Sequence, residues 1–218
     1  MKAIVFDLDG TLVDSAPDIH AAACAVLEAE GLAPVTAAQT RSFIGDGAPV
    51  FIERLIAAQG LPPAQDRHAR MLARFLDRYE TAHDLTTLYP GALQALHALR
   101  AAGMALAMCT NKPAAPARAV LHHFGLSDLF PVLVAGDTLP QRKPDPAPLR
   151  AAIAGLGVRD DAQVVFVGDS EVDARTAERA GLRFALFTQG YRRGPVDTIS
   201  HWARFDDFAE LPALLAGG

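Results

Sequence analysis

Cysteine is scarce in this sequence, and lysine is nearly as scarce. Cys24 and Cys109 are the only cysteines and form no CxxC pair, so neither a disulfide framework nor a structural zinc site is indicated. Lysine occurs only at Lys2, Lys112 and Lys143 among 20 basic residues. The formal net charge of -5 also indicates no basic face of the kind that binds nucleic acid. We therefore expect a protein of the reducing cytoplasm with no nucleic-acid partner.

Long apolar runs are missing as well. The first run lasts only from residue 3 to residue 6, and no later segment approaches 18 uninterrupted apolar residues. We therefore expect a chain that is neither exported nor inserted in a membrane. Its 218 residues, half of them hydrophobic, suit one large domain or a core with a smaller companion. Both a monomer and a small homo-oligomer fit this composition.

Short apolar runs alternate with helix-length segments over most of the chain. Segments such as "GALQALHALRAAG" and "VDARTAERAG" carry apolar residues three or four positions apart, which is typical of amphipathic helices. The short runs are apolar at consecutive positions, as in strands buried on both faces of a parallel sheet. These strands are expected at residues 3–6, 104–109, 132–135, 163–167 and 183–187. The alternation predicts an α/β fold with a doubly wound parallel sheet, similar to a Rossmann core.

Residues 16–83 break this alternation. They contain helical patterns such as "PVFIERLIAAQG" and no convincing strand. We predict that they form an all-helical cap, while residues 1–15 and 84–218 form a catalytic α/β core. Because the insertion directly follows the first strand, it would lie over the carboxyl ends of the strands, where open α/β sheets bind their ligands.

Polar side chains follow several of the predicted strands. Asp7 and Asp9 follow the first, and similar groups occur in "CTNK" at 109–112, "RKPDP" at 142–146 and "VGDSEVD" at 167–173. Each alone is explained as a helix cap, a turn or a solvated loop residue. Together they place several carboxylates, a lysine and a hydroxyl on one rim. That set suits a phosphate bound with a divalent cation, because Mg²⁺ prefers carboxylate oxygens.

In order and spacing, these motifs resemble those of the haloacid dehalogenase superfamily over nearly the whole chain. They occur here as "DLDGT", "TN" at 110 and 111, Lys143 followed by proline, and "GDSEVD". The resemblance implies that Asp7 attacks phosphorus to give an aspartyl-phosphate. It implies that Asp9 first protonates the leaving group and later deprotonates water. Thr110 and Lys143 would then stabilise the phosphoryl oxygens.

The same resemblance implies a magnesium site and further substrate contacts. Its metal ligands would be the Asp7 side chain, the Asp9 carbonyl and Asp169, with Asp173 reaching the ion through water. Asn111, next to Thr110, would join the substrate contacts.

A narrower resemblance concerns the cap. Stretches such as "LVDSAPDI", "FIGDGAPVFIERL", "TNKP", "RKPDPAPL" and "FTQGYRRG" are similar to the phosphoglycolate phosphatase group. This implies a small phosphorylated metabolite as substrate, with 2-phosphoglycolate as the candidate. The "GDG" loop of Gly45, Asp46 and Gly47 would close over the site. Arg54 is a candidate for binding the substrate carboxylate, and the loop amides are an alternative, since an arginine on an amphipathic helix is usually solvated.

Other functions compatible with the motifs remain open. A sugar phosphomutase similar to β-phosphoglucomutase would share all four motifs, and product analysis with hexose 1-phosphates would identify it. A catalytically silent binding protein is another alternative, although it would be expected to have lost a motif residue, and none is lost. Asp9 argues against dehalogenation, because the dehalogenases lack an acid at this position. The absence of lysine from residues 16–83 argues against the Schiff-base branch that cleaves phosphonoacetaldehyde.

Overall fold

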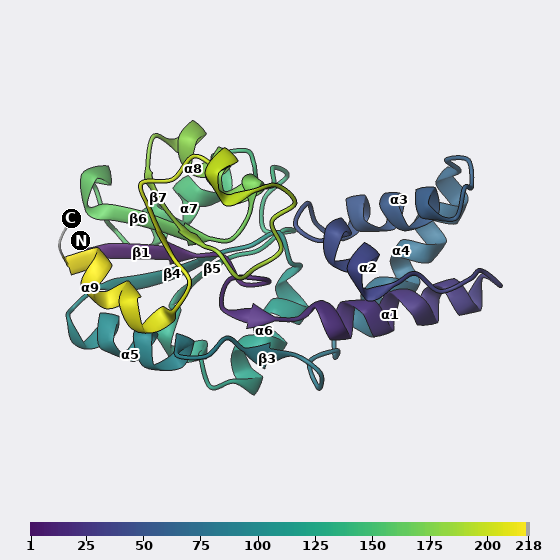
Figure 1. The fold of residues 1–218 in the computed structure, drawn as a ribbon, viewed down its shortest axis with the longest axis horizontal. Coiled ribbons are helices and arrows are strands. Elements are labelled where there is room, and N and C mark those ends of the chain that lie inside the picture. Colours follow the sequence, from purple (N-terminus) through teal and green to yellow (C-terminus); the bar gives the residue numbers. More distant parts are fainter. Residues whose placement is uncertain (217–218) are drawn as a thin grey trace.

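A six-stranded parallel sheet forms the middle layer of the larger part of the molecule in the computed structural model, which describes residues 1–216 (Figure 1). The order across the sheet is β5-β4-β1-β6-β7-β8. The strands are β1 (Ala3–Phe6), β4 (Ala105–Cys109), β5 (Val132–Val134), β6 (Val164–Gly168), β7 (Arg183–Phe187) and β8 (Ala203–Phe205). The predicted α/β fold is confirmed. β8 was not predicted, because it is short and Arg204 interrupts its apolar pattern.

Helices cover both faces of the sheet, which explains why its strands are apolar at consecutive positions. The core helices are α5 (Ala92–Ala101), α6 (Ala114–His123), α7 (Ala147–Gly155), α8 (Glu171–Ala180) and α9 (Leu211–Ala216). In β1, Ile4 and Phe6 pack into the hydrophobic cluster shared with α5, α6 and α9. Ala3 and Val5 pack into the opposite cluster, shared with α7 and α8. Short 3₁₀ turns complete the core at Ser127–Leu129, Asp161–Gln163, Val196–Thr198 and Phe208–Glu210.

Four further helices form a separate group at one end of the molecule (Figure 1). They are α1 (Ala16–Ala29), α2 (Ala37–Phe43), α3 (Ala48–Ala58) and α4 (Gln65–Tyr79). They bury their own hydrophobic cluster, which includes Phe51 and Phe75. α2 was missed in the sequence, although Thr36 and Gln39 form a capping box at its start.

A short antiparallel ribbon lies where the chain enters and leaves these four helices. It pairs β2 (Val13–Asp14) with β3 (Thr87–Leu88). The exact limits of the cap and core at residues 15/16 and 83/84 stay a prediction. Within residues 1–216, no helix combines the length and hydropathy needed to cross a membrane.

Candidate active site

The candidate site lies at the carboxyl ends of the central strands, beneath the cap helices. The register aligns Phe6 of β1 with Met108 of β4 and Val167 of β6. The residues that follow these strands therefore leave the sheet at the same edge. The backbone N–H of Asp7 also donates to the carbonyl of Val167 at 2.9 Å, which holds the first aspartate beside β6.

Three buried aspartates lie close together at this edge, and two of them pair with one lysine. One carboxylate oxygen from each of Asp7, Asp169 and Asp173 lies within 4.8 Å of the others. Lys143 Nζ lies 2.9 Å from Asp7 Oδ1 and 2.7 Å from Asp173 Oδ1. Asp173 is placed by the first turn of α8, where it shares a capping box with Ser170.

The charges of these aspartates and of Lys143 favour the binding of a further cation. Burial raises the pKa of Asp7 to about 6, although Lys143 opposes the shift. Burial is the main reason that the pKa of Asp169 lies well above its usual value, and the negative charges of Asp173 and Asp7 raise it further. Burial alone would lower the pKa of Lys143, but Asp173 and Asp7 raise it instead. The three carboxylates therefore repel one another, and one ammonium group pairs with only two of them, Asp7 and Asp173.

The donor set of these residues fits a magnesium ion. Asp7 Oδ1 is buried, and the Lys143 ammonium lies 2.9 Å from it. Asp169 is held by the Thr11 hydroxyl, which donates to Oδ1 at 2.8 Å, and by the Tyr191 N–H, which donates to Oδ2 at 2.6 Å. Hard carboxylate oxygens on fixed side chains are the ligands that Mg²⁺ takes in proteins.

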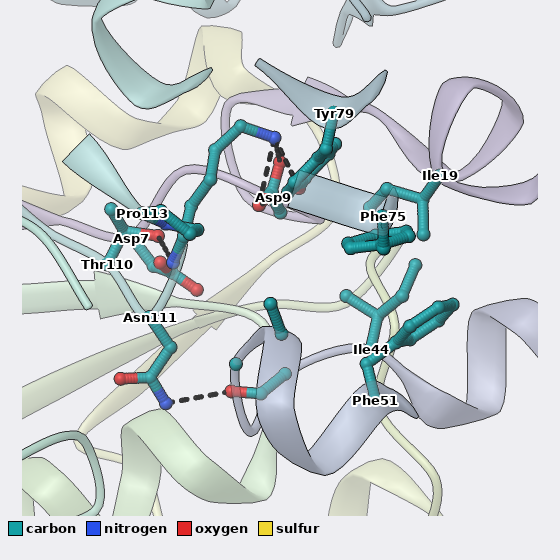
Figure 2. Close-up of a pocket in the computed structure, with 14 residues that line it drawn as sticks. Asp7, Asp9, Ile19, Ile44, Phe51, Phe75, Tyr79, Thr110, Asn111 and Pro113 are labelled. Atoms are coloured by element: carbon teal, nitrogen blue, oxygen red, sulfur yellow. Dashed lines mark hydrogen bonds and ion pairs between the residues drawn. The ribbon is translucent and has the colours of Figure 1, made fainter. Parts of the chain in front are cut away.

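Asp9 has a different environment from Asp7. Ser15 Oγ donates to Asp9 Oδ1 at 2.6 Å, and Lys112 Nζ donates to the same oxygen at 3.1 Å. Lys112 Nζ also donates to the hydroxyl of Tyr79, and that hydroxyl lies 3.4 Å from Asp9 Oδ2. Figure 2 shows the contacts among Asp9, Lys112 and Tyr79. The sequence analysis assigned no role to Lys112 or Tyr79. For Lys112 there was a signal, because it directly follows the "TN" motif; for Tyr79 there was none.

A small cavity of about 40 Å³ separates these polar groups from the cap. Asp7, Asp9 and Thr110 line it from the core, and apolar cap residues line it from the other side (Figure 2). These apolar residues are Ile19, Ile44, Phe51 and Phe75, together with the glycines Gly45 and Gly47. Gly45 and Gly47 have φ values of 118° and 87°, in the left-handed region that glycine adopts without strain.

Asn111 connects the cap loop with two core loops. Its Nδ2 donates to the carbonyls of Gly45 and Lys143, each at 2.9 Å. Its Oδ1 accepts a hydrogen bond from the Lys143 N–H at 3.0 Å. The side chain is therefore occupied by backbone groups, and this placement favours positioning of the loops over direct contact with substrate.

The structure does not bring Arg54 and Asp46 into the cavity. Arg54 donates to Asp46 Oδ2 at 2.5 Å and to the Phe43 carbonyl at 2.8 Å. Arg193 of the core donates to the same Asp46 oxygen at 2.8 Å and to the Ile44 carbonyl at 2.9 Å. Burial would raise the pKa of Asp46, but its bonds to Arg193 and Arg54 hold it below the usual value. These residues lie in a contact between cap and core, so a carboxylate of the substrate would have to displace Asp46 to reach Arg54.

Known proteins are similar to this chain in both sequence and fold. The sequence model of the haloacid dehalogenase-like hydrolases matches residues 1–181. The chain is 55% identical over 216 residues to a phosphoglycolate phosphatase of Cereibacter sphaeroides, covering 99% of this chain and 98% of that protein. A phosphoglycolate phosphatase of Rhodobacter capsulatus is 44% identical over 215 residues, covering 99% and 97%.

Solved structures are similar to this chain over nearly its whole length. A structure described as a "predicted phosphoglycolate phosphatase" from Haemophilus somnus has a TM-score of 0.92 and 33% identity, covering 98% of this chain and 97% of that one. CbbY from Rhodobacter sphaeroides, solved with xylulose 1,5-bisphosphate, has a TM-score of 0.82 and 27% identity, covering 97% and 96%. The expected resemblance is confirmed, and so is the expected enzyme class, a phosphoric monoester hydrolase. The chain therefore belongs to the haloacid dehalogenase-like hydrolase family.

Proposed function

We propose that this hydrolase is a Mg²⁺-dependent phosphatase that cleaves small phosphate monoesters, with 2-phosphoglycolate as its substrate. The observation that carries the proposal is the placement of Asp7 and Asp9 on one cavity, each with its own lysine, Lys143 and Lys112. The names of the close relatives support the choice of substrate.

In the proposed mechanism the two aspartates have separate tasks. Asp7 attacks phosphorus and carries the phosphoryl group as an aspartyl-phosphate. Asp9 protonates the leaving alkoxide, and then takes a proton from the water that hydrolyses this intermediate. Lys143 and the Thr110 hydroxyl stabilise the negative charge on the phosphoryl oxygens.

Magnesium would be held by Asp7, Asp169 and the Asp9 carbonyl, with Asp173 nearby. When bound, it would neutralise phosphate charge at the site. Asp173 also pairs with Lys143 at 2.7 Å, so its proposed task includes holding this lysine beside Asp7.

The proposed cap, residues 16–83, would open to admit substrate and close over the core formed by residues 1–15 and 84–218. Closure excludes water from the site and strengthens the charge interactions inside it. The loop of Gly45, Asp46 and Gly47 would move with the cap. The similarity to relatives named phosphoglycolate phosphatase supports a phosphatase over the alternative phosphomutase.

The test is a comparison of kcat/KM across phosphate monoesters with Mg²⁺ present. The panel contains 2-phosphoglycolate, hexose 1- and 6-phosphates and nucleoside monophosphates. We expect 2-phosphoglycolate to exceed the others by at least about 10-fold, because only it combines a small and an anionic leaving group. A hexose phosphate with the highest kcat/KM, or conversion of a hexose 1-phosphate to its 6-isomer, would contradict the proposal.

Metal removal gives a second test. EDTA is expected to abolish hydrolysis of 2-phosphoglycolate and added Mg²⁺ to restore it, while Ca²⁺ does not, because its larger and looser coordination shell misplaces the nucleophile. Asp169→Asn is expected to raise the Mg²⁺ concentration needed for half-maximal rate by at least about 10-fold. Full activity in metal-free buffer, or an unchanged Mg²⁺ requirement in the variant, would contradict the proposed site.

The contact between Arg193 and the cap gives a third prediction. Arg193→Ala is expected to raise KM for 2-phosphoglycolate by about 10-fold, because the closed cap loses a charge-assisted bond to Asp46 and a bond to the Ile44 carbonyl. Arg204→Ala is the matched control, since Arg204 pairs with the exposed Asp197 and is expected to behave as wild type. Equal KM values for the two variants would show that Arg193 does not stabilise closure.

A further inference from the structure

Lys112 has an unusual position for a lysine. Its side chain is 0% exposed, and its ammonium group lies 4.0 Å from the centre of the Tyr79 ring. Burial lowers the pKa of Lys112, while the neighbouring Asp9 opposes this shift. Such burial costs free energy unless the charge is paired, and the partner of Lys112 is Asp9 at 3.1 Å. Neither the proposed nucleophile Asp7 nor the proposed metal site uses the ammonium group.

Lys112 is also the one cation that lines the cavity within the described residues 1–216. The opposite wall is formed by apolar groups such as Ile19, Phe51 and Phe75, which give an anion no compensation for lost hydration. Arg54 is occupied by Asp46 and lies outside this lining. A second negative charge on the substrate would therefore find its partner at Lys112.

The geometry of the proposed reaction also places the substrate carboxylate near Lys112. In 2-phosphoglycolate the carboxylate is bonded to the carbon that carries the ester oxygen, and Asp9 is the proposed proton donor to that oxygen. The carboxylate must therefore lie next to Asp9, and Lys112 Nζ lies 3.1 Å from Asp9 Oδ1. An ammonium group has three N–H donors, so two can remain on Asp9 and Tyr79 while the third binds the substrate.

We propose that Lys112, oriented by the Tyr79 hydroxyl, binds the carboxylate of the leaving group and makes the enzyme select anionic small leaving groups. The inference rests on the proposed function, because it names the group that recognises the proposed substrate. It also assigns a role to the cap, since Tyr79 ends α4 and reaches Lys112 when the cap covers the core.

The experiment compares 2-phosphoglycolate with glycolamide phosphate, in which a neutral amide replaces the carboxylate. Wild type is expected to prefer 2-phosphoglycolate in kcat/KM, and Lys112→Gln to lower that preference by at least about 10-fold, mainly through KM. Lys112→Arg retains the charge and is expected to restore part of the preference. Lys2→Gln is the matched control, because Lys2 is exposed before β1, and it should keep the wild-type ratio.

The outcomes separate the two proposals. If wild type prefers 2-phosphoglycolate and Lys112→Gln keeps the same ratio, the role of Lys112 is overturned while the proposed function stands. If wild type cleaves both compounds equally, the proposed substrate is wrong, and the inference fails with it. If circular dichroism shows that Lys112→Gln is unfolded, Tyr79→Phe is the deciding variant. It is expected to lower the ratio by about 3-fold through loss of one hydrogen bond, and an unchanged ratio would overturn the proposal.

Discussion

Asp7→Asn is expected to lower kcat for 2-phosphoglycolate by at least about 10³-fold, because an amide is a poor nucleophile and a weaker metal ligand. The structure gives Asp7 an environment that suits this role, because its Oδ1 is buried 2.9 Å from the ammonium of Lys143. The measurement is kcat together with the recovery of ³²P-labelled protein after acid quenching. Wild type should carry label, and the variant should not.

The matched control is Asp206→Asn, the same chemical change at an exposed position near the C-terminus, which should leave both readouts unchanged. A circular dichroism melt of each variant shows whether it is folded. Asp7→Asn protein that is folded and keeps more than a hundredth of the wild-type kcat would contradict the assignment of Asp7 as nucleophile.

Asp9→Asn is expected to lower kcat by about 10²- to 10⁴-fold, because general acid and base catalysis at this position would be lost. Ser15 and Lys112 would still hold the side chain through its oxygen, since both donate to Oδ1. The variant is therefore expected to impair proton transfer more than it displaces the side chain at position 9.

The two steps assigned to Asp9 can be separated with p-nitrophenyl phosphate, whose leaving group needs little protonation. With this substrate, Asp9→Asn is expected to release a burst of nitrophenol and then to accumulate labelled protein, because hydrolysis of the intermediate lacks its base. Normal turnover on both substrates would show that Asp9 has only a structural role.

The position of Arg54 could not be predicted from its neighbours in the sequence. Arg54 stands near the "GDG" loop in the sequence, and this proximity suggested a substrate contact. In the folded chain, its partner is Asp46, which also binds Arg193 from a loop 147 positions away. Arg54 lies outside the lining of the cavity, and this position depends on which segments meet in space.

The sequence by itself determined the sheet and the motif residues of the site. Strands buried on both faces are apolar at consecutive positions, and the polar residues that follow parallel strands leave the sheet at one edge. Asp7, Asp169 and Lys143 could therefore be placed together from the chain order alone.

Only the tertiary structure decided which groups face the leaving group. Tyr79 and Lys112 are 33 positions apart and lie on opposite sides of the cap–core boundary, and no local pattern joins a helix end in the cap to a loop in the core. Their contact exists because α4 packs within the cap with its last turn above Asp9 (Figure 2). The proposed reaction is thus encoded by short motifs that follow the core strands. The proposed recognition depends on how the cap helices pack against the core, and that geometry is set by many side chains.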